Sequence, residues 1–546
     1  MALPEYFGRN AVAVSQAISG LDEERLQHQL HDVIIGITVG PEVKRPEGRA
    51  IADLIVRLLA RLYPRLTLHS TAGTAPVVRD MQDLATRINP RIEFGGTPNV
   101  EIIIGTPPRL KASSIRRIFV GSNGWEAHVS TKGPLSCGLT DIPFGPGLAA
   151  CLAAANVFRS VFVPDASLDL DARLNPVGEG ELAQFREQLR GTMGRVVLAG
   201  AGAIGNAAAW ALSRVTMEGT LDIVDHESVD MGNLQRYVLA EREHVDAAKA
   251  PLLAKYFQCS VQARAFEADL ATYLQSNGYD NPRMLLALDS ARDRRAAQAS
   301  LPQWVANAWT QPGDVGLSTH DFVGGACVSC LYLPDKPHRN EDEVIAEAFG
   351  VSDRLMEVRT LLFRGEGAPR TLLEAIAAAR DLELDRLLPF EGRPLRSLYT
   401  EGFCGGAVIP LGEAGKPRAD VHVPLAHQSA LAGVLLAAAV VRHALGGAAQ
   451  SRITQVDLLK PLPVELTRPA DKHPSGSCIC QDQDYQQVYV AKYAQTHDPV
   501  DPAKPKLKGA PASSETSRRT SARASRQSRV MDTAKPAEGV VARKLG

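Results

Sequence analysis

The sequence predicts an α/β protein organised around a Rossmann-like nucleotide-binding unit. An apolar strand over 195–199 runs into a glycine-rich turn containing Gly200, Gly202 and Gly205. An alanine-rich helix follows over 206–215, and a second strand ends at Asp225. The glycines let the backbone approach a phosphate, and the start of the helix supplies N–H donors. A carboxylate at the tip of the second strand can accept hydrogen bonds from ribose hydroxyls. These features alone indicate an adenine nucleotide such as NAD, FAD or ATP.

A second motif begins at the end of that strand. Residues 225–236 read DHESVDMGNLQR and resemble the D-x-D-x-V-x-x-x-N-L-x-R signature of the ubiquitin-activating-type adenylyltransferases. This superfamily includes ThiF and MoeB, the bacterial activators of sulfur carriers. Lys249 follows Arg236 at the distance where the family keeps a phosphate-contacting lysine. Asp289, which ends the apolar run 283–289, matches a magnesium-binding aspartate, and Arg294 matches a further family arginine.

The resemblance implies an enzyme that joins a protein carboxyl terminus to the α-phosphate of ATP. Arg236 and Lys249 would neutralise the phosphates, and Asp289 would hold Mg²⁺. The nucleotide-binding set it implies is Gly200, Gly202, Gly205, Asp225, Asn233, Arg236, Lys249 and Asp289. Two positions depart from the family pattern: Glu227 replaces an aspartate, and Tyr237 stands where glutamine is usual. The alternative is a plain Rossmann dehydrogenase, which has no need of an arginine–lysine pair here.

Length and composition set broad limits. A chain of 546 residues has room for two or three domains, and its net charge of −1 predicts neither nucleic-acid nor membrane binding. We find no apolar run that approaches the roughly 20 residues of a spanning helix, and no signal peptide. Eight cysteines without an export signal favour reduced thiols. We therefore expect a cytoplasmic protein.

The first 165 residues predict another α/β unit. An apolar strand over 33–37 precedes an amphipathic helix over 51–62, but no Gly-x-Gly-x-x-Gly and no Asn-Leu-x-Arg follow. Residues 142–159 parallel 423–442, since both are a strand end feeding an alanine-rich helix. We interpret 1–165 as an inactive adenylation-like α/β domain, as in the paired halves of the larger ubiquitin-activating enzymes. The alternatives for assembly are a homodimer and an intramolecular pseudo-dimer.

The remaining chain divides into four parts. We predict that 166–339 and 406–497 form the active adenylation domain, interrupted by a helical catalytic-cysteine insert over 340–405. Residues 498–546 are rich in proline, serine, alanine and arginine, which predicts a disordered basic tail. The tail is either a solubilising segment or an arm that touches a partner.

Two cysteine pairs are candidate metal ligands. They are Cys327 with Cys330, spaced C-x-x-C, and Cys478 with Cys480, spaced C-x-C. Tetrahedral zinc takes four such ligands. The resemblance implies a structural Zn²⁺ here, because related sulfur-carrier activators hold zinc on two C-x-x-C pairs. The narrower second pair departs from that pattern, and ordinary reduced cysteines or a redox pair remain the alternatives.

Cys404 is a candidate nucleophile. It lies between Phe403 and two glycines, which leave a sulfur approachable and free backbone N–H groups to stabilise an anion. Ubiquitin-activating enzymes carry their catalytic cysteine in an insertion at this part of the fold, so the resemblance implies a thioester on Cys404. The alternative is a small buried thiol in a tight turn. Cys137, Cys151 and Cys259 are expected to be core or incidental cysteines.

The length of the chain and its helical insert are similar to the longer bacterial ubiquitin-activating-like proteins of ubiquitin-like conjugation and antiphage defence. This similarity implies two partners, a ubiquitin-like protein as substrate and a ubiquitin-conjugating-like enzyme as acceptor. The runner-up is a sulfur-carrier or peptide adenylyltransferase without thioester transfer. A third possibility, a regulatory subunit without activity, is disfavoured by the intact Arg236, Lys249 and Asp289 set.

Overall fold

The computed structural model describes most of the chain up to residue 494. The described residues are 3–18, 21, 23–110, 114–163, 167–178, 181–182, 185, 189–258, 260–311, 314–333, 341–404, 423–463 and 466–494. The predicted basic tail 498–546, the segment 405–422 after Cys404, and Cys259 lie outside the described residues.

The N-terminal half is built on a seven-stranded sheet of order β3-β2-β1-β4-β5-β6-β7. Strands β1 to β5 run parallel, while β6 and β7 pair antiparallel. The strands are β1 (Ile35–Val39), β2 (Arg65–His69), β3 (Glu93–Phe94), β4 (Val100–Ile104), β5 (Arg116–Asn123), β6 (Glu126–Ser130) and β7 (Asp171–Leu174). Its helices are α1 (Phe7–Ala17), α2 (Glu23–Asp32), α3 (Pro46–Leu59), α4 (Ala75–Ile88) and α5 (Phe144–Phe162).

The second half is built on an eight-stranded sheet of order β10-β9-β8-β11-β12-β13-β14-β15. Its strands are β8 (Thr192–Ala199), β9 (Glu218–Val224), β10 (Val261–Phe266), β11 (Met284–Leu286), β12 (Trp304–Gln311), β13 (Asp314–Asp321), β14 (Arg452–Val456) and β15 (Thr467–Pro469). The helices around this sheet are α7 (Ala203–Leu212), α8 (Lys249–Ala254), α9 (Leu270–Asn277), α10 (Ala291–Ala299), α11 (Val328–Tyr332), α16 (Ala426–Ala444) and α17 (Gln483–Tyr493). The predicted helix over 206–215 thus begins earlier, directly at the glycine turn.

The two sheets share one topology. Counted within its own half, the first seven strands of each sheet have the order 3-2-1-4-5-6-7, with the first five parallel and the next two antiparallel, and the second sheet adds β15 at its edge. In each half a long alanine-rich helix lies between the sixth and seventh strands, α5 in the first and α16 in the second. The predicted α/β class is confirmed, and the parallel between 142–159 and 423–442 reflects equivalent places in the two sheets.

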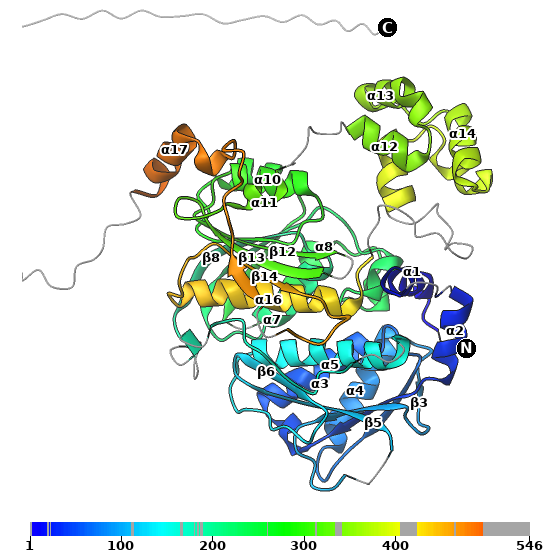
Figure 1. Ribbon diagram of the computed structural model, residues 1–546, viewed down its shortest axis with the longest axis vertical. Coiled ribbons are helices and arrows are strands. Elements are labelled where there is room, and N and C mark those ends of the chain that lie inside the picture. The colour runs from blue at the N-terminus through cyan, green and yellow to red at the C-terminus, as the bar shows by residue number, and fades with distance from the viewer. Residues whose placement is uncertain are drawn as a thin grey trace, which may run out of the picture. The chain divides into compact units, whose positions relative to one another are not determined.

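The halves meet through these long helices. Helix α16 packs on both α7 and α5, and Figure 1 shows the three helices between the two sheets. Gly433 of α16 lies so close to α7 that an added Cβ would overlap the carbonyl oxygen of Ile204. Helix α5 is long and apolar enough to cross a membrane, which the sequence analysis did not predict. However, 89% of its apolar stretch is buried inside the protein. It is therefore the core helix of a folded domain.

The insert between β13 and α16 has a core of its own. It contains α12 (Glu341–Phe349), α13 (Leu355–Arg364), α14 (Arg370–Arg380), α15 (Leu395–Ser397) and a π-helical turn over Leu398–Cys404. Phe349 and Phe403 pack edge-to-face with ring centres 4.8 Å apart. The described part of the insert is helical, as predicted.

Candidate active site

The glycine turn follows β8 because two glycines allow a backbone that other residues would block. Gly200 has a φ of +97°, and a Cβ there would lie 2.5 Å from the carbonyl oxygen of Ala287, beyond β11. A Cβ on Gly205 would overlap the carbonyl oxygen of Gly200. Gly202 instead has open space, since its nearest neighbour is the Tyr237 hydroxyl at 3.6 Å from the added Cβ position. The turn therefore leaves a surface at Gly202 that a phosphate can approach.

Asp225 follows β9 and fixes this turn. Its carboxylate accepts hydrogen bonds from the backbone N–H of Ala201 at 2.7 Å and of Glu227 at 2.9 Å. The predicted ribose-binding carboxylate thus lies beside the glycine turn, at the carboxyl end of the neighbouring parallel strand. This is the edge of a doubly wound sheet at which ligands bind.

Asn233 lies in a short 3-10 helix over Met231–Gln235. Its side-chain oxygen accepts a hydrogen bond from the backbone N–H of Asp230, and the Asp230 carboxylate accepts one from Gly232. These reciprocal bonds form a capping box. Asn233 therefore shapes the turn that leads into Arg236, while its predicted contact with ATP stays a prediction.

Arg236 and Lys249 both face the ring of Tyr237, which is buried. The Lys249 nitrogen lies 5.5 Å and the Arg236 guanidinium carbon 5.7 Å from the ring centre. The Lys249 ammonium also binds the Glu227 carboxylate. Burial lowers the pKa of Lys249, but Tyr237 and Glu227 outweigh burial and raise this pKa above its usual value. Both predicted phosphate-binding cations therefore lie against the same tyrosine ring.

Asp289 lies just beyond β11, and its side chain is exposed. Its loop packs against the glycine turn, because the backbone N–H of Ala287 donates to Ala199 at 2.9 Å. Arg294 is buried and donates to the carbonyl oxygens of Leu288 and Ala308. The structure thus gives Arg294 a role in holding this loop. The glycine turn, Asp225 and Asp289 all follow carboxyl ends of adjacent parallel strands.

The four predicted metal ligands come together although the two pairs are far apart in sequence. The sulfur atoms of Cys327, Cys330, Cys478 and Cys480 all lie within 4.8 Å of one another, and all four residues are buried. The Cys327 and Cys478 sulfurs are 3.4 Å apart, as are those of Cys330 and Cys480. Hydrogen bonding from the Cys327 thiol lowers the pKa of Cys330 to about 7. Four sulfur donors at these spacings suit a tetrahedral Zn²⁺ with Zn–S bonds of about 2.3 Å.

This thiol cluster fastens the last helix to the second sheet. Cys478 and Cys480 directly precede α17, whose Tyr489 hydroxyl donates to the carbonyl oxygen of Gln303 at 2.7 Å. The Tyr489 ring stacks on Phe322 with centres 4.9 Å apart. A metal in the cluster would therefore join two chain segments.

Cys404 ends the π-helical turn of the insert, but its side chain is outside what the structure describes. Its predicted role as nucleophile stays a prediction. Two other cysteines have fully described surroundings. Cys137 and Cys151 are buried, and burial raises the pKa of Cys137 to about 12 and that of Cys151 above its usual value.

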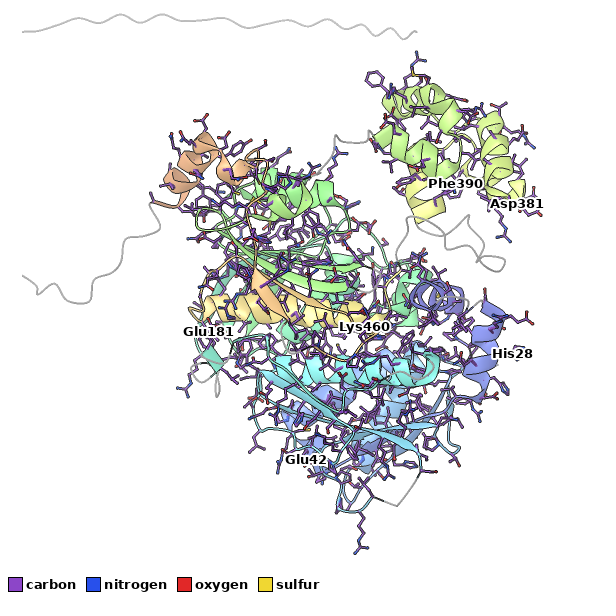
Figure 2. The ribbon with its side chains drawn as sticks, in the orientation of Figure 1. His28, Glu42, Glu181, Asp381, Phe390 and Lys460 are labelled. Carbon is purple, nitrogen blue, oxygen red and sulfur yellow. The ribbon has the colours of Figure 1, made fainter. Side chains whose placement is uncertain are left out.

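In the N-terminal half, two carboxylates occupy the region that corresponds to the glycine turn. Glu42, labelled in Figure 2, follows β1 and accepts a hydrogen bond from the backbone N–H of Thr106 beyond β4. Glu47 is 1% exposed and accepts hydrogen bonds from Ser122, Gly124 and Thr140. Donors that could bind an anion are therefore bound to the protein's own carboxylates.

The sequence did not predict a role for Asp53 and Arg57 of α3 or for Arg61 in the turn that follows this helix. Arg57 and Arg61 donate to backbone carbonyls on both sides of Arg236. No local pattern signals these contacts, because they join residues more than 170 positions apart.

A ThiF family model matches residues 171–479, which is more than half of the chain, and a model for Prokaryotic E2 family C matches residues 42–163. Uncharacterized protein y4jF of Sinorhizobium fredii is 36% identical over 517 residues, covering 92% of this chain and 99% of that protein.

Among solved structures, the chain is similar to crystal structures of E. coli MccB. For MccB with ATP, the identity is 13% and the TM-score 0.32, covering 53% of this chain and 67% of that chain. For MccB with succinimide, the identity is 13% and the TM-score 0.31, covering 52% of this chain and 65% of that chain. From the family match and the sequence relative, the chain belongs to the ThiF family of nucleotide-binding adenylyltransferases.

Proposed function

We propose that this protein uses ATP to activate the carboxyl terminus of a ubiquitin-like protein and then holds that protein as a thioester. The observation that carries the adenylation step is the meeting of Arg236 and Lys249 on the Tyr237 ring, near the open surface of Gly202. A carboxylate and a triphosphate are both anions, and two clustered cations lower the cost of bringing them together.

In the first step a carboxylate oxygen of the substrate attacks the α-phosphorus of ATP. The bond from this phosphorus to the bridging oxygen breaks, and pyrophosphate leaves with the electron pair. Arg236 and Lys249 stabilise the charge on the phosphates, and Asp225 orients the ribose. The exposed Asp289 carboxylate would hold Mg²⁺, which supplies further charge neutralisation when bound.

In the second step the thiolate of Cys404 attacks the acyl carbon of the adenylate, and AMP leaves. One observation supports a thioester outside the N-terminal half. Cys137 and Cys151 are buried with raised pKa values, so neither described cysteine within residues 42–163 presents a thiolate. The match of this region to a family named for prokaryotic E2 proteins supports a place in ubiquitin-like conjugation.

The N-terminal half serves in this proposal as an inactive partner of the second half. Its seven strands have the order and directions of the first seven strands of the other sheet, and Glu42 and Glu47 lie in the region where the other half has its glycine turn. One chain would therefore be an intramolecular pseudo-dimer with one nucleotide site.

The test is ATP–pyrophosphate exchange, with candidate ubiquitin-like carriers from the same genome. Exchange should require the carrier, and Arg236→Ala or Asp289→Ala should abolish it. Arg49→Ala is the matched control, because Arg49 is half-exposed and pairs with Asp80 at 2.6 Å within the N-terminal half. Tight binding of NAD without exchange would overturn the proposed activation reaction.

A further inference from the structure

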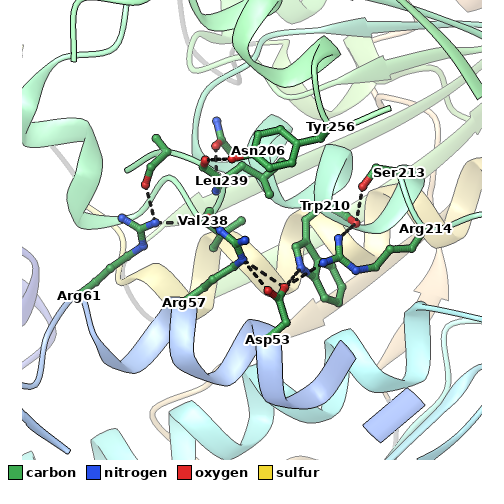
Figure 3. A network of polar contacts seen from close by, with 11 residues as sticks. Asp53, Arg57, Arg61, Asn206, Trp210, Ser213, Arg214, Val238, Leu239 and Tyr256 are labelled. Atoms are coloured by element: carbon green, nitrogen blue, oxygen red, sulfur yellow. Dashed lines mark hydrogen bonds and ion pairs between the residues drawn. The ribbon is translucent and has the colours of Figure 1, made fainter. Parts of the chain in front are cut away.

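Helix α3 of the N-terminal half and the turn that follows it present three charged side chains to the second half. Asp53 and Arg57 are four residues apart on one face of α3, and Arg61 lies in the turn just after the helix ends at Leu59. Figure 3 shows them directed toward α7 and toward the segment 234–240, which begins within the Asn-Leu-x-Arg motif. This segment carries Arg236 and Tyr237.

Arg61 is the centre of the contact. It is 1% exposed and donates to the carbonyl oxygens of Leu234, of Val238 at 3.2 Å and of Ala240 at 2.8 Å. Arg57 donates to the Val238 oxygen at 2.9 Å. The accepting carbonyls lie on both sides of Arg236. Because the guanidinium is a rigid planar fork, these bonds fix the path of the backbone between them.

Asp53 anchors the same face of α3 to α7. Its carboxylate accepts hydrogen bonds from the indole N–H of Trp210 at 2.7 Å, from Arg214 at 2.9 Å and from Arg57 at 3.1 Å. Helix α7 begins at the glycine turn. Helix α3 is therefore bonded both to the segment with Arg236 and to the helix that follows the glycine turn.

The segment 234–240 is also joined directly to the glycine turn through Asn206. The backbone N–H of Leu239 donates to the Asn206 side-chain oxygen at 3.3 Å. The Asn206 amide donates in turn to the carbonyl oxygens of Ala201 at 2.9 Å and Gly202 at 3.1 Å. Figure 3 shows Asn206 beside Leu239. One chain of hydrogen bonds thus runs from α3 to both parts of the phosphate-binding surface.

We propose that Arg61, assisted by Arg57, is a positioning residue that sets the place of Arg236 relative to the glycine turn. The inactive half then contributes to catalysis through the backbone of the active half. This inference rests on the proposed adenylation function. Cations stabilise a transition state most when they are held in place beforehand, so loosening the segment should cost rate without removing any group that touches ATP.

The experiment compares Arg61→Met, Arg57→Met and the control Arg49→Met, which changes an arginine of α3 that pairs with Asp80. Pyrophosphate-exchange kcat and the KM for ATP are measured on the full chain, together with the melting temperature. We expect Arg61→Met to lower kcat about tenfold, Arg57→Met to lower it less, and Arg49→Met to leave it unchanged. A lower melting temperature in Arg61→Met with unchanged kcat and KM overturns the proposal.

A double-mutant cycle tests whether Arg61 acts through Arg236. Adding Arg61→Met to Arg236→Ala should weaken ATP binding much less than it does in the wild-type background. Additive losses overturn the proposal. Should Arg61→Met fail to fold, Arg57→Met carries the same comparison, because Arg57 makes only one of the contacts to the segment 234–240.

A second readout separates this inference from the proposed function. Amide hydrogen exchange over 234–240 should become faster in Arg61→Met and stay unchanged in Arg49→Met, with or without catalysis. If the wild-type chain catalyses no ATP–pyrophosphate exchange with any carrier, the proposed function fails. The positioning role of Arg61 is then tested by amide hydrogen exchange over 234–240 and by the affinity for ATP. If both are the same in Arg61→Met as in the wild type, the positioning role is overturned.

Discussion

The ammonium nitrogen of Lys249 lies 5.5 Å from the centre of the Tyr237 ring. This contact, together with that of Arg236 on the same ring, brings two cations together at a buried position where like charges repel. The negative face of an aromatic ring offsets part of that repulsion. The predicted phosphate-binding pair therefore depends on a tyrosine at a position where the sequence departs from the family pattern.

Replacing Tyr237 should separate the contribution of its ring from that of its hydroxyl. Tyr237→Phe keeps the ring, so we expect exchange within about twofold of the wild type. Tyr237→Leu removes it and should raise the KM for ATP or lower kcat by about tenfold, since a desolvated cation–π contact contributes about 1–2 kcal/mol. Steady-state exchange kinetics measure both. Equal activity of the Phe and Leu variants would show that the ring does not organise the cations.

The thiol cluster predicts one bound zinc per chain. Metal analysis of the purified protein should find about one equivalent, and Cys327→Ser with Cys330→Ser should remove it and lower the melting temperature. Cys151→Ala is the control, because Cys151 is a buried cysteine of α5 far from the cluster in sequence. The zinc assignment is wrong if the wild type is metal-free and as stable as the protein with zinc added.

Cys404 separates a conjugation activator from a simple adenylyltransferase. With ATP and the ubiquitin-like partner, the wild type should form an adduct on non-reducing gels that dithiothreitol removes, because thiols cleave thioesters. Cys404→Ala should lose the adduct but retain pyrophosphate exchange, since adenylation precedes the thiol step. Cys404→Ser should retain exchange as well.

Other outcomes of the same experiment have clear meanings. An adduct that persists in Cys404→Ala and disappears in Cys330→Ser would transfer the nucleophile to the thiol cluster. Exchange without any adduct would favour the alternative, a sulfur-carrier or peptide adenylyltransferase.

His427 predicts how stability depends on pH. It is 5% exposed at the start of α16, where burial, assisted by the charge of Arg159, lowers its pKa to about 3. In the unfolded chain a histidine has a pKa of about 6.5. Below that pH the unfolded state binds a proton that the folded state does not, so stability is lost as pH falls from 6.5. The loss for this residue is about 1.4 kcal/mol per pH unit.

His427→Gln should therefore make the free energy of unfolding depend less steeply on pH between about pH 6 and 4.5, by the contribution of one bound proton. Urea unfolding at several pH values measures this slope. His31→Gln is the control, because the His31 side chain is 64% exposed. An unchanged slope in His427→Gln would mean that His427 has the same pKa in the folded and the unfolded protein.

Most of the candidate nucleotide site could be predicted from the sequence. The glycine turn, Asp225 and the Asn-Leu-x-Arg motif are short segments whose spacing fixes their places at the ends of strands. Parallel strands bring these ends to one edge, so the motifs were enough to predict that the side chains meet. The alanine-rich repeats also indicated two related sheets, because a core helix between two layers is apolar all round.

Contacts between distant segments were decided only by tertiary structure. Arg61 meets the carbonyl of Leu234 across 173 positions, and Cys327 meets Cys478 across 151. No sequence motif predicts that Glu42 and Glu47 occupy the region equivalent to the glycine turn. A local sequence pattern predicts which face of a helix is apolar. It does not predict which buried charged side chain will bond to which backbone carbonyl. That choice is made when the two sheets pack through α5, α7 and α16, since buried donors such as those of Arg57 and Arg61 then find acceptors in the opposite half.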